Sequence, residues 1–207
     1  SDTWSHGKNS FDSPPEGAFE IHKIETEEAG PLRSIVRLDT RYAYSRSSVR
    51  QIFYREKPYV DFLVDLYNLE QFKLIKLIIP VPNGQFRYDR IAKGYLERPQ
   101  NQLEFPFMKW SWFSNSQKTS STNGTGIISP NCFSCSGIDN FFNLTLLRSP
   151  TFAWHDPAKI SDANRFYNTD QGLSSYQIRI CFDVTIDEMD QYTCLLYTSP
   201  SPRDETK

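Results

Sequence analysis

The sequence predicts an all-β fold, a large antiparallel β-sandwich. Apolar and polar residues alternate along several segments, and Pro and Gly turn signals separate these segments at short intervals. No stretch of ten or more residues shows the 3.6-residue period of a helix. Because successive side chains of a strand point to opposite faces, the alternation is typical of half-buried strands. Many short strands divided by turns favour a sandwich.

The clearest strand spans 176–186, where every second residue is apolar: Tyr176, Ile178, Ile180, Phe182, Val184 and Ile186. Its other face carries polar residues such as Arg179. The same alternation predicts strands over 60–66, whose polar face carries Asp61, and over 71–81. Turn signals delimit the remaining strand candidates, which are 18–25, 32–43, 47–55, 85–97 and 141–148.

Two segments do not have a strand pattern. Residues 113–126 (FSNSQKTSSTNGTG) are rich in Ser, Thr, Asn and Gly and predict a mobile loop. The segment 152–172 is longer than a simple hairpin connection, and long ordered loops are often functional. His155 and Asp156 in this segment could be metal ligands, but His-Asp-Pro in a loop is more typical of a turn.

Composition excludes some classes of partner. The 207 residues carry a formal net charge of −2, so no basic excess indicates nucleic-acid binding. The longest apolar run, LIKLIIPV (74–81), is far shorter than the ~20 residues that cross a bilayer, so no membrane partner is expected. No segment at the start has the pattern of a signal peptide, and a cytoplasmic location is expected.

Cys132 and Cys135 form a single CxxC pair. One such pair cannot complete a tetrahedral zinc site, which needs four ligands. A redox pair would stand at the start of a helix, whereas Gly, Ser and Asn surround this one. Ordinary loop thiols are therefore the favoured interpretation, with a redox motif as the alternative.

The C-terminal segment CLLYTSPSPRD (194–204) resembles the in-frame translation of a common transposon-type sequencing adapter. Residues 194–207 are therefore interpreted as an artefactual, disordered tail and excluded from reasoning about the fold. The predicted domain is 1–193.

Several phrases then occur in a characteristic order: SDTWSHG (1–7), EAGPLRSIVRLDTRY (28–42), GYLERP (94–99), LTLLRSP (144–150) and NTDQGLSSYQIRICF (168–182). In this order they resemble the C-terminal β-domain of glycoside hydrolase family 38, the α-mannosidases, in its bacterial and cytosolic branch. LTLLRSP followed by DQG and a long strand is the most specific part. The sequence departs from the family at 127–139, where an LLND-x-KYG motif is usual, and after Phe182.

The resemblance implies a galactose-mutarotase-like supersandwich, incomplete at both ends, and a retaining α-mannosidase as the full-length protein. Such an enzyme acts on mannose-containing glycans or oligosaccharides with two carboxyl groups about 5–5.5 Å apart. It also uses a divalent metal, usually zinc. In the family these groups lie on an N-terminal catalytic domain, which would be the partner of this β-domain. No position of this sequence matches the nucleophile or metal motifs, so no catalytic and no metal residue is assigned. A homo-oligomer is left open.

Arg148, at the end of the LTLLRSP strand, is the first candidate for substrate binding that the resemblance implies. It would donate to a sugar hydroxyl or fix an aspartate. The alternative is a strand-end arginine paired with a carboxylate such as Asp156 or Asp170, because the guanidinium fork suits carboxylates anywhere. Asp170 could be that partner or a turn former.

Asp2, Trp4 and His6 lie where the family's chain leaves its helical bundle, so the resemblance implies a domain interface or pocket rim. Trp4 could instead be an exposed remnant of a lost interface. The aromatic segment FPFMKWSWF (105–113) could be a sugar-stacking platform, but core or interdomain packing is favoured. The alternative function for the whole chain is a stand-alone carbohydrate-binding or scaffold sandwich without catalytic activity.

Overall fold

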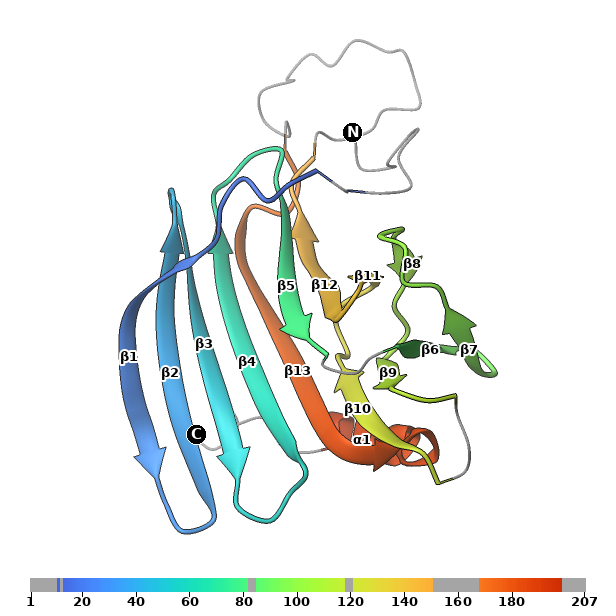
Figure 1. Ribbon diagram of the computed structural model, residues 1–207. Helices are drawn as coiled ribbons and strands as arrows, with labels where there is room; N and C mark the ends of the chain where they lie inside the picture. Colours follow the sequence, from blue (N-terminus) through green and yellow to red (C-terminus); the bar gives the residue numbers. More distant parts are fainter. Residues whose placement is uncertain (1–10, 12, 82–84, 118–120, 151–167, 199–207) are drawn as a thin grey trace, which may run out of the picture.

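The protein folds into two antiparallel β-sheets, which confirms the predicted sandwich (Figure 1). The computed structural model describes residues 11, 13–81, 85–117, 121–150 and 168–198. The larger sheet has nine strands in the order β1-β2-β3-β4-β13-β10-β9-β6-β7, and the smaller has four in the order β5-β12-β11-β8. No helix within the described ranges is long and apolar enough to cross a membrane.

The strands of the larger sheet are β1 (Glu20–Ala29), β2 (Arg33–Tyr42), β3 (Ser45–Tyr54), β4 (Tyr59–Asn68), β6 (Phe86–Ile91), β7 (Gly94–Arg98), β9 (Trp110–Ser114), β10 (Asn123–Ile128) and β13 (Gly172–Thr185). Those of the smaller sheet are β5 (Leu74–Pro80), β8 (Phe105–Pro106), β11 (Ser134–Ile138) and β12 (Phe141–Arg148). A 3₁₀ turn, η1 (Ile186–Glu188), leads into one helix, α1 (Met189–Thr198).

The main core lies between the two sheets. Apolar residues from β4, β9, β10 and β13 meet those of β5 and β12, as in the edge-to-face contact of Phe113 with Phe142 at 5.1 Å between ring centroids. The residues of β4 predicted to face inward do so, with Val64 and Leu66 buried. Burial of such side chains stabilises the fold by about 1.5–3 kcal/mol each.

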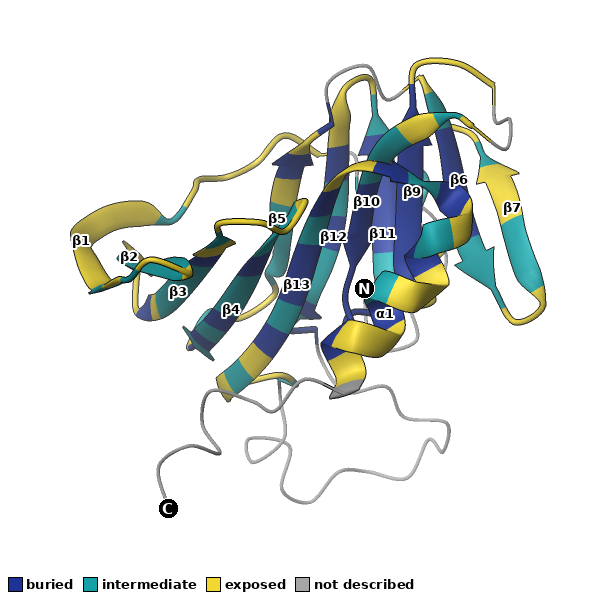
Figure 2. Cartoon of the chain, turned by 90° about the horizontal axis from the view of Figure 1, so that it is seen from below, coloured by how far each residue is buried: buried dark blue, intermediate teal, exposed yellow. Residues whose placement is uncertain are grey.

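A second core lies on the opposite face of the larger sheet. The indoles of Trp110 and Trp112 are buried there among residues of β10, β13 and α1. Trp112 donates to the Val184 carbonyl at 2.9 Å, and Trp110 donates to Asp190 of α1 at 2.8 Å. Figure 2 shows α1 beside the ends of β9, β10 and β13. The sequence prediction contained no helix, and α1 corrects it.

A β-bulge in β13 changes which face its apolar residues occupy. Gly124 of β10 pairs with Val184 and Gly126 pairs with Cys181, so Phe182 and Asp183 together oppose Thr125. Asp183 has a φ of 55°, in the left-handed region. An extra residue reverses the alternation beyond it. Val184 therefore joins the core beside α1, not the core shared by Tyr176 and Ile178, and Phe182 is exposed, contrary to the predicted single apolar face.

Other boundaries also differ from the prediction. Residues 113–126, predicted as a loop, include the start of β10 and the end of β9, and 85–97 forms the hairpin of β6 and β7. The tail expected from Cys194 onward continues α1 as far as Thr198, because Leu196 is buried against the second core. Residues 199–207 lie outside the described ranges.

β1 is the edge strand of the larger sheet and is exposed along almost its whole length. Two bulges interrupt its pairing with β2. Glu25 and Glu27 form ion pairs with Arg37 of β2 at 3.1 and 3.0 Å. Bulges and charged residues on an edge strand oppose the addition of further strands, which explains how so exposed an edge is tolerated.

Candidate functional site

Four strand ends meet at the end of the sandwich drawn uppermost in Figure 1. β12 ends and β5 begins there in the smaller sheet, and β4 ends and β13 begins there in the larger one. Antiparallel pairing brings these ends together although 76 positions separate Lys73 from Ser149. The candidate site is defined as Arg148, Ser149, Asp170, Asn68 and Lys73.

Arg148 is the last residue of β12 and pairs with Leu74 of β5. It is half-buried, and its guanidinium carbon lies 5.7 Å from the ring centroid of Phe11. A guanidinium over an aromatic face is attracted by the ring quadrupole. The contact with Phe11 holds Arg148 at the end of the sandwich.

Asp170 is exposed and forms the turn that leads into β13. Its φ is 52°, a left-handed conformation that Asp tolerates better than most residues, and Gly172 follows with a φ of 93°. The main-chain oxygen of Asp170 accepts a hydrogen bond from Nδ2 of Asn68 at 2.8 Å. The turn therefore presents the Asp170 carboxylate to solvent beside the end of β4.

Asn68 is a residue that the sequence analysis missed. It is fully buried at the end of β4, and its Oδ1 accepts from the Glu70 amide at 3.1 Å while its Nδ2 holds Asp170. A buried side-chain amide with both ends bonded fixes the backbone around it. The available signal was an Asn two residues after the predicted strand 60–66, since Asn near a strand end is typical of a turn contact.

Ser149 fixes the other half of the site. Its hydroxyl accepts from the Lys73 amide at 3.1 Å, and its carbonyl accepts from Nδ2 of Asn168 at 3.1 Å and from the Phe72 amide at 2.8 Å. The Lys73 ammonium bonds the Glu16 carboxylate, and this hydrogen bond raises the pKa of Lys73. The site is thus a polar rim that contains the Arg148 guanidinium, the Lys73–Glu16 ion pair and the exposed Asp170 carboxylate.

Most of the other predicted site residues lie outside the part of the chain that the structure describes. Asp2, Trp4 and His6 lie outside the described residues, as do His155 and Asp156. The aromatic segment 105–113 is described, and its residues Trp110, Trp112 and Phe113 are at most 2% exposed. The favoured interpretation of this segment as packing is confirmed for these three side chains.

Cys132, Cys135 and Cys181 are buried, whereas Cys194 is exposed. Cys132 lies in the loop before β11, as predicted, whereas Cys135 lies within β11, so the interpretation as a loop thiol is corrected for Cys135. Burial raises the pKa of Cys135 to about 12. Burial likewise raises the pKa of Cys132 to about 11. Both thiols are therefore protonated near neutral pH, which argues against a redox motif.

Within the part of the chain that the structure describes, no group of three or more His, Cys, Asp or Glu side chains could hold a metal ion.

An open antiparallel sandwich with a polar rim at one end is the class of protein that these features define. No family model matches the chain, and no curated protein matches it. The fold is similar to that of an α-mannosidase from Enterococcus faecalis V583, with a TM-score of 0.64, 10% identity, and coverage of 86% of this chain and 24% of that one. It is also similar to a glycosyl hydrolase family 38 protein from Enterococcus faecalis, with a TM-score of 0.62, 11% identity and the same coverage, 86% and 24%.

This likeness shows the fold alone. The chain spans about a quarter of the length of the two solved structures. What the structures show is therefore a mostly β chain whose fold resembles part of a family 38 α-mannosidase.

Proposed function

We propose that this chain acts as the β-domain of a family 38 α-mannosidase, and that the end of the sandwich with Arg148 borders the sugar-binding site. The observation that carries the proposal is the fold likeness over 86% of the chain to an α-mannosidase. The order of the LTLLRSP and DQG phrases supports the same family, and these two phrases contribute Arg148, Ser149 and Asp170 to one end of the sandwich.

Under this proposal, bond cleavage belongs to a catalytic domain outside these 207 residues. Retaining cleavage needs two carboxyl groups about 5–5.5 Å apart, and no position here matches the family's nucleophile. The described residues also do not fit a metal site, so the zinc that the family implies is assigned to the catalytic domain. The contribution of this chain is to bind and orient a mannose-containing glycan.

Arg148 carries that contribution. A guanidinium presents several donors in a fixed fork, and these suit either the hydroxyls of a sugar or a carboxylate of the catalytic domain. Asn68 and Ser149 act as positioning residues because they hold the strand ends around Arg148 and Asp170. A cytoplasmic location and association with the protein's own N-terminal domain belong to the same proposal.

The test uses the complete reading frame, expressed with zinc and assayed on a chromogenic aryl α-mannoside. Arg148→Ala is expected to lower kcat/KM at least about tenfold, which corresponds to about 1.4 kcal/mol. Arg148→Lys is expected to recover only part of this loss, because an ammonium lacks the fork. Arg55→Ala, an exposed arginine in the β3–β4 turn, is the matched control and is expected to leave kcat/KM unchanged.

Two results would count against the proposal. The 207-residue chain alone is expected to show no turnover, with or without zinc, so clean turnover by this chain would contradict the division of roles. Equal kcat/KM for wild type and Arg148→Ala would remove Arg148 from the sugar site. The alternative, a stand-alone carbohydrate-binding or scaffold sandwich, predicts that the complete reading frame encodes no catalytic domain with paired aspartates and metal-ligand histidines.

A further inference from the structure

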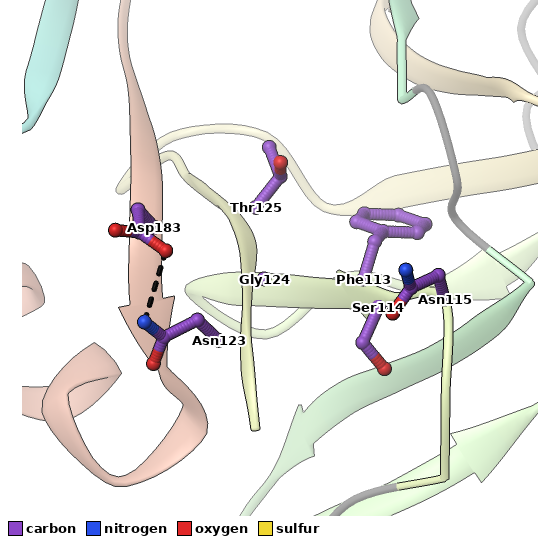
Figure 3. Close-up of a pocket in the computed structure, with 7 residues that line it drawn as sticks. All are labelled: Phe113, Ser114, Asn115, Asn123, Gly124, Thr125 and Asp183. Carbon is purple, nitrogen blue, oxygen red and sulfur yellow. Dashed lines mark hydrogen bonds between the residues drawn. The ribbon is translucent and has the colours of Figure 1, made fainter. Parts of the chain in front are cut away.

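A polar hollow lies at the other end of β13 from Asp170 (Figure 3). Its volume is about 200 Å³, and Asn115, Asn123, Thr125 and Asp183 are among the residues that line it. At about 3.3 Å per residue, Asp183 is roughly 40 Å along the strand from Asp170. The hollow is therefore separate from the candidate site described above.

The β-bulge of β13 creates one wall of the hollow. It holds Asp183 at a φ of 55°, so the exposed carboxylate turns toward the neighbouring strand β10. Nδ2 of Asn123 donates to Oδ1 of Asp183 at 2.9 Å. Bulges often re-aim a side chain at a functional position, and a non-glycine residue in the left-handed region is a reason to ask what it does.

Gly124, which lines the hollow, packs closely against β9. A Cβ at this position would lie 2.1 Å from the Phe113 carbonyl oxygen and 2.8 Å from atoms of the Trp112 ring, so only glycine fits. Glycine within a strand often marks a place where another group approaches the backbone closely. Asn123 and Thr125 are two residues apart on β10, so their side chains project from the same face of the strand, and both line the hollow.

The side chains that line the hollow indicate which class of ligand it could bind. The side chains include one carboxylate and no lysine or arginine, which disfavours an anion. The described residues hold no cluster of acidic, histidine or cysteine ligands for a metal. Besides the groups that bond each other, the Asn123–Asp183 pair has one further amide N–H, the amide oxygen and a second carboxylate oxygen. These adjacent donors and acceptors could form hydrogen bonds with neighbouring hydroxyl groups of one ligand.

We propose that this hollow binds a neutral sugar ring through the Asn123–Asp183 pair, as a second, non-catalytic glycan contact. Its volume is below the ~300–1,000 Å³ typical of sites for larger ligands, so one ring is the expected occupant. The choice of a mannoside as the probe rests on the proposed function. Binding at this hollow does not require cleavage, so the two proposals fail separately.

The test is a titration of the 207-residue chain with methyl α-mannoside, followed by amide NMR. Saturable shifts are expected at Asn123, Gly124 and Thr125, with an affinity on the order of millimolar, as for one small ring. Asp183→Asn is expected to weaken binding at least about tenfold, because asparagine tolerates the left-handed backbone but lacks the charged acceptor. Thr125→Val, which removes one hydroxyl without changing side-chain shape, is expected to weaken it as well.

The matched control is Asp139→Asn, an exposed aspartate with a φ of 51° in the turn between β11 and β12, which is expected to bind like wild type. Three results would overturn the proposal. The first is the absence of saturable shifts at the hollow even at high sugar concentration. The second is unchanged binding by both Asp183→Asn and Thr125→Val in folded protein. The third is a calcium-induced shift at the hollow where the mannoside gives none.

Discussion

Arg179 of β13 and Asp61 of β4 form a bidentate ion pair, with N–O distances of 2.6 and 2.8 Å. Both side chains are at most 5% exposed. The Arg179 guanidinium also stacks on the ring of Tyr59 at 3.9 Å and donates to the Tyr192 carbonyl in α1, while the Tyr54 hydroxyl donates to Asp61 at 3.1 Å. The pair thus joins the centre of the larger sheet to the helix that covers it.

Arg179→Met is expected to lower the free energy of unfolding by about 3–5 kcal/mol, because it leaves the Asp61 carboxylate buried without its partner. The measurement is urea unfolding of wild type and variant. Arg50→Met is the matched control, since Arg50 pairs with Glu27 on the exposed part of the same sheet. Its expected cost is about 0–1 kcal/mol.

The double variant Arg179→Met with Asp61→Leu separates the cost of an unpaired buried charge from the cost of altered packing. Replacing both members of a buried pair by apolar residues is often close to neutral, so the double variant is expected to be more stable than Arg179→Met alone. A loss of less than about 1 kcal/mol in Arg179→Met would show that the pair does not anchor β13 to β4.

Tyr54 should make stability depend on alkaline pH. Burial, together with the nearby Asp61 carboxylate, raises the pKa of Tyr54 to about 12. Because the unfolded pKa is about 10, the native state holds this proton more tightly, and the resulting stability is complete below about pH 10. That stability is lost as pH rises from about 10 to about 12.

The measurement compares wild type with Tyr54→Phe by unfolding at several alkaline pH values and by ultraviolet titration of the phenols. Tyr54→Phe should reduce the fall in stability over that window, because the other tyrosines are unchanged. A Tyr54 that titrates like a free phenol would show that the hydrogen bond to Asp61 is absent in solution.

Gly124→Ala tests the close approach of β10 to β9. The added Cβ would meet the Phe113 carbonyl oxygen at 2.1 Å, and backbone atoms cannot move aside as a flexible side chain can. The expected cost is about 1–3 kcal/mol or more. Gly30→Ala, whose Cβ would lie 3.3 Å from the Arg33 carbonyl oxygen at an exposed hairpin, is the control and should cost less than about 1 kcal/mol. Similar unfolding midpoints for the two variants would contradict this packing.

Alternation predicted the β-sandwich because the strands with one buried face dominate the chain. β4 and β12 lie where the pattern placed them. The alternation could not reveal the bulge at Asp183. Apolar and polar residues still alternate in the sequence through the bulge, but the extra residue moves the following side chains to the opposite face of the sheet. The alternation also assigned Asp61 and Arg179 to a solvated face, because pairing across strands that are distant in sequence is invisible in either strand alone.

The helical segment made of η1 and α1 had a local signal at its start that periodicity alone did not detect. Thr185 and Glu188 have the spacing of a capping box, and Oε2 of Glu188 accepts from the Thr185 amide at 2.7 Å and hydroxyl at 2.8 Å. At the candidate site, Arg148 and Asp170 were predicted from phrases of the sequence. Their relation through Asn68 and Ser149 depends on strand ends brought together only by the sheet pairing.

The four cysteine thiols should differ in how fast they react with a disulfide reagent. Burial raises the pKa of Cys132 to about 11 and that of Cys135 and Cys181 to about 12, and each of these side chains is at most 2% exposed. Cys194 is exposed on α1. Because the thiolate is the nucleophile, a disulfide reagent at about pH 8 should modify one thiol rapidly and the others only after unfolding.

Two serine variants test this assignment. Cys194→Ser should abolish the fast phase, whereas Cys132→Ser should leave it unchanged. The total after denaturation should still equal the number of cysteines present in each variant. Rapid modification of a second thiol in the native protein would mean that the sheets open to the reagent. Since Cys135 and Cys181 belong to different cores, identifying which of them reacts would show whether the small sheet or α1 detaches first.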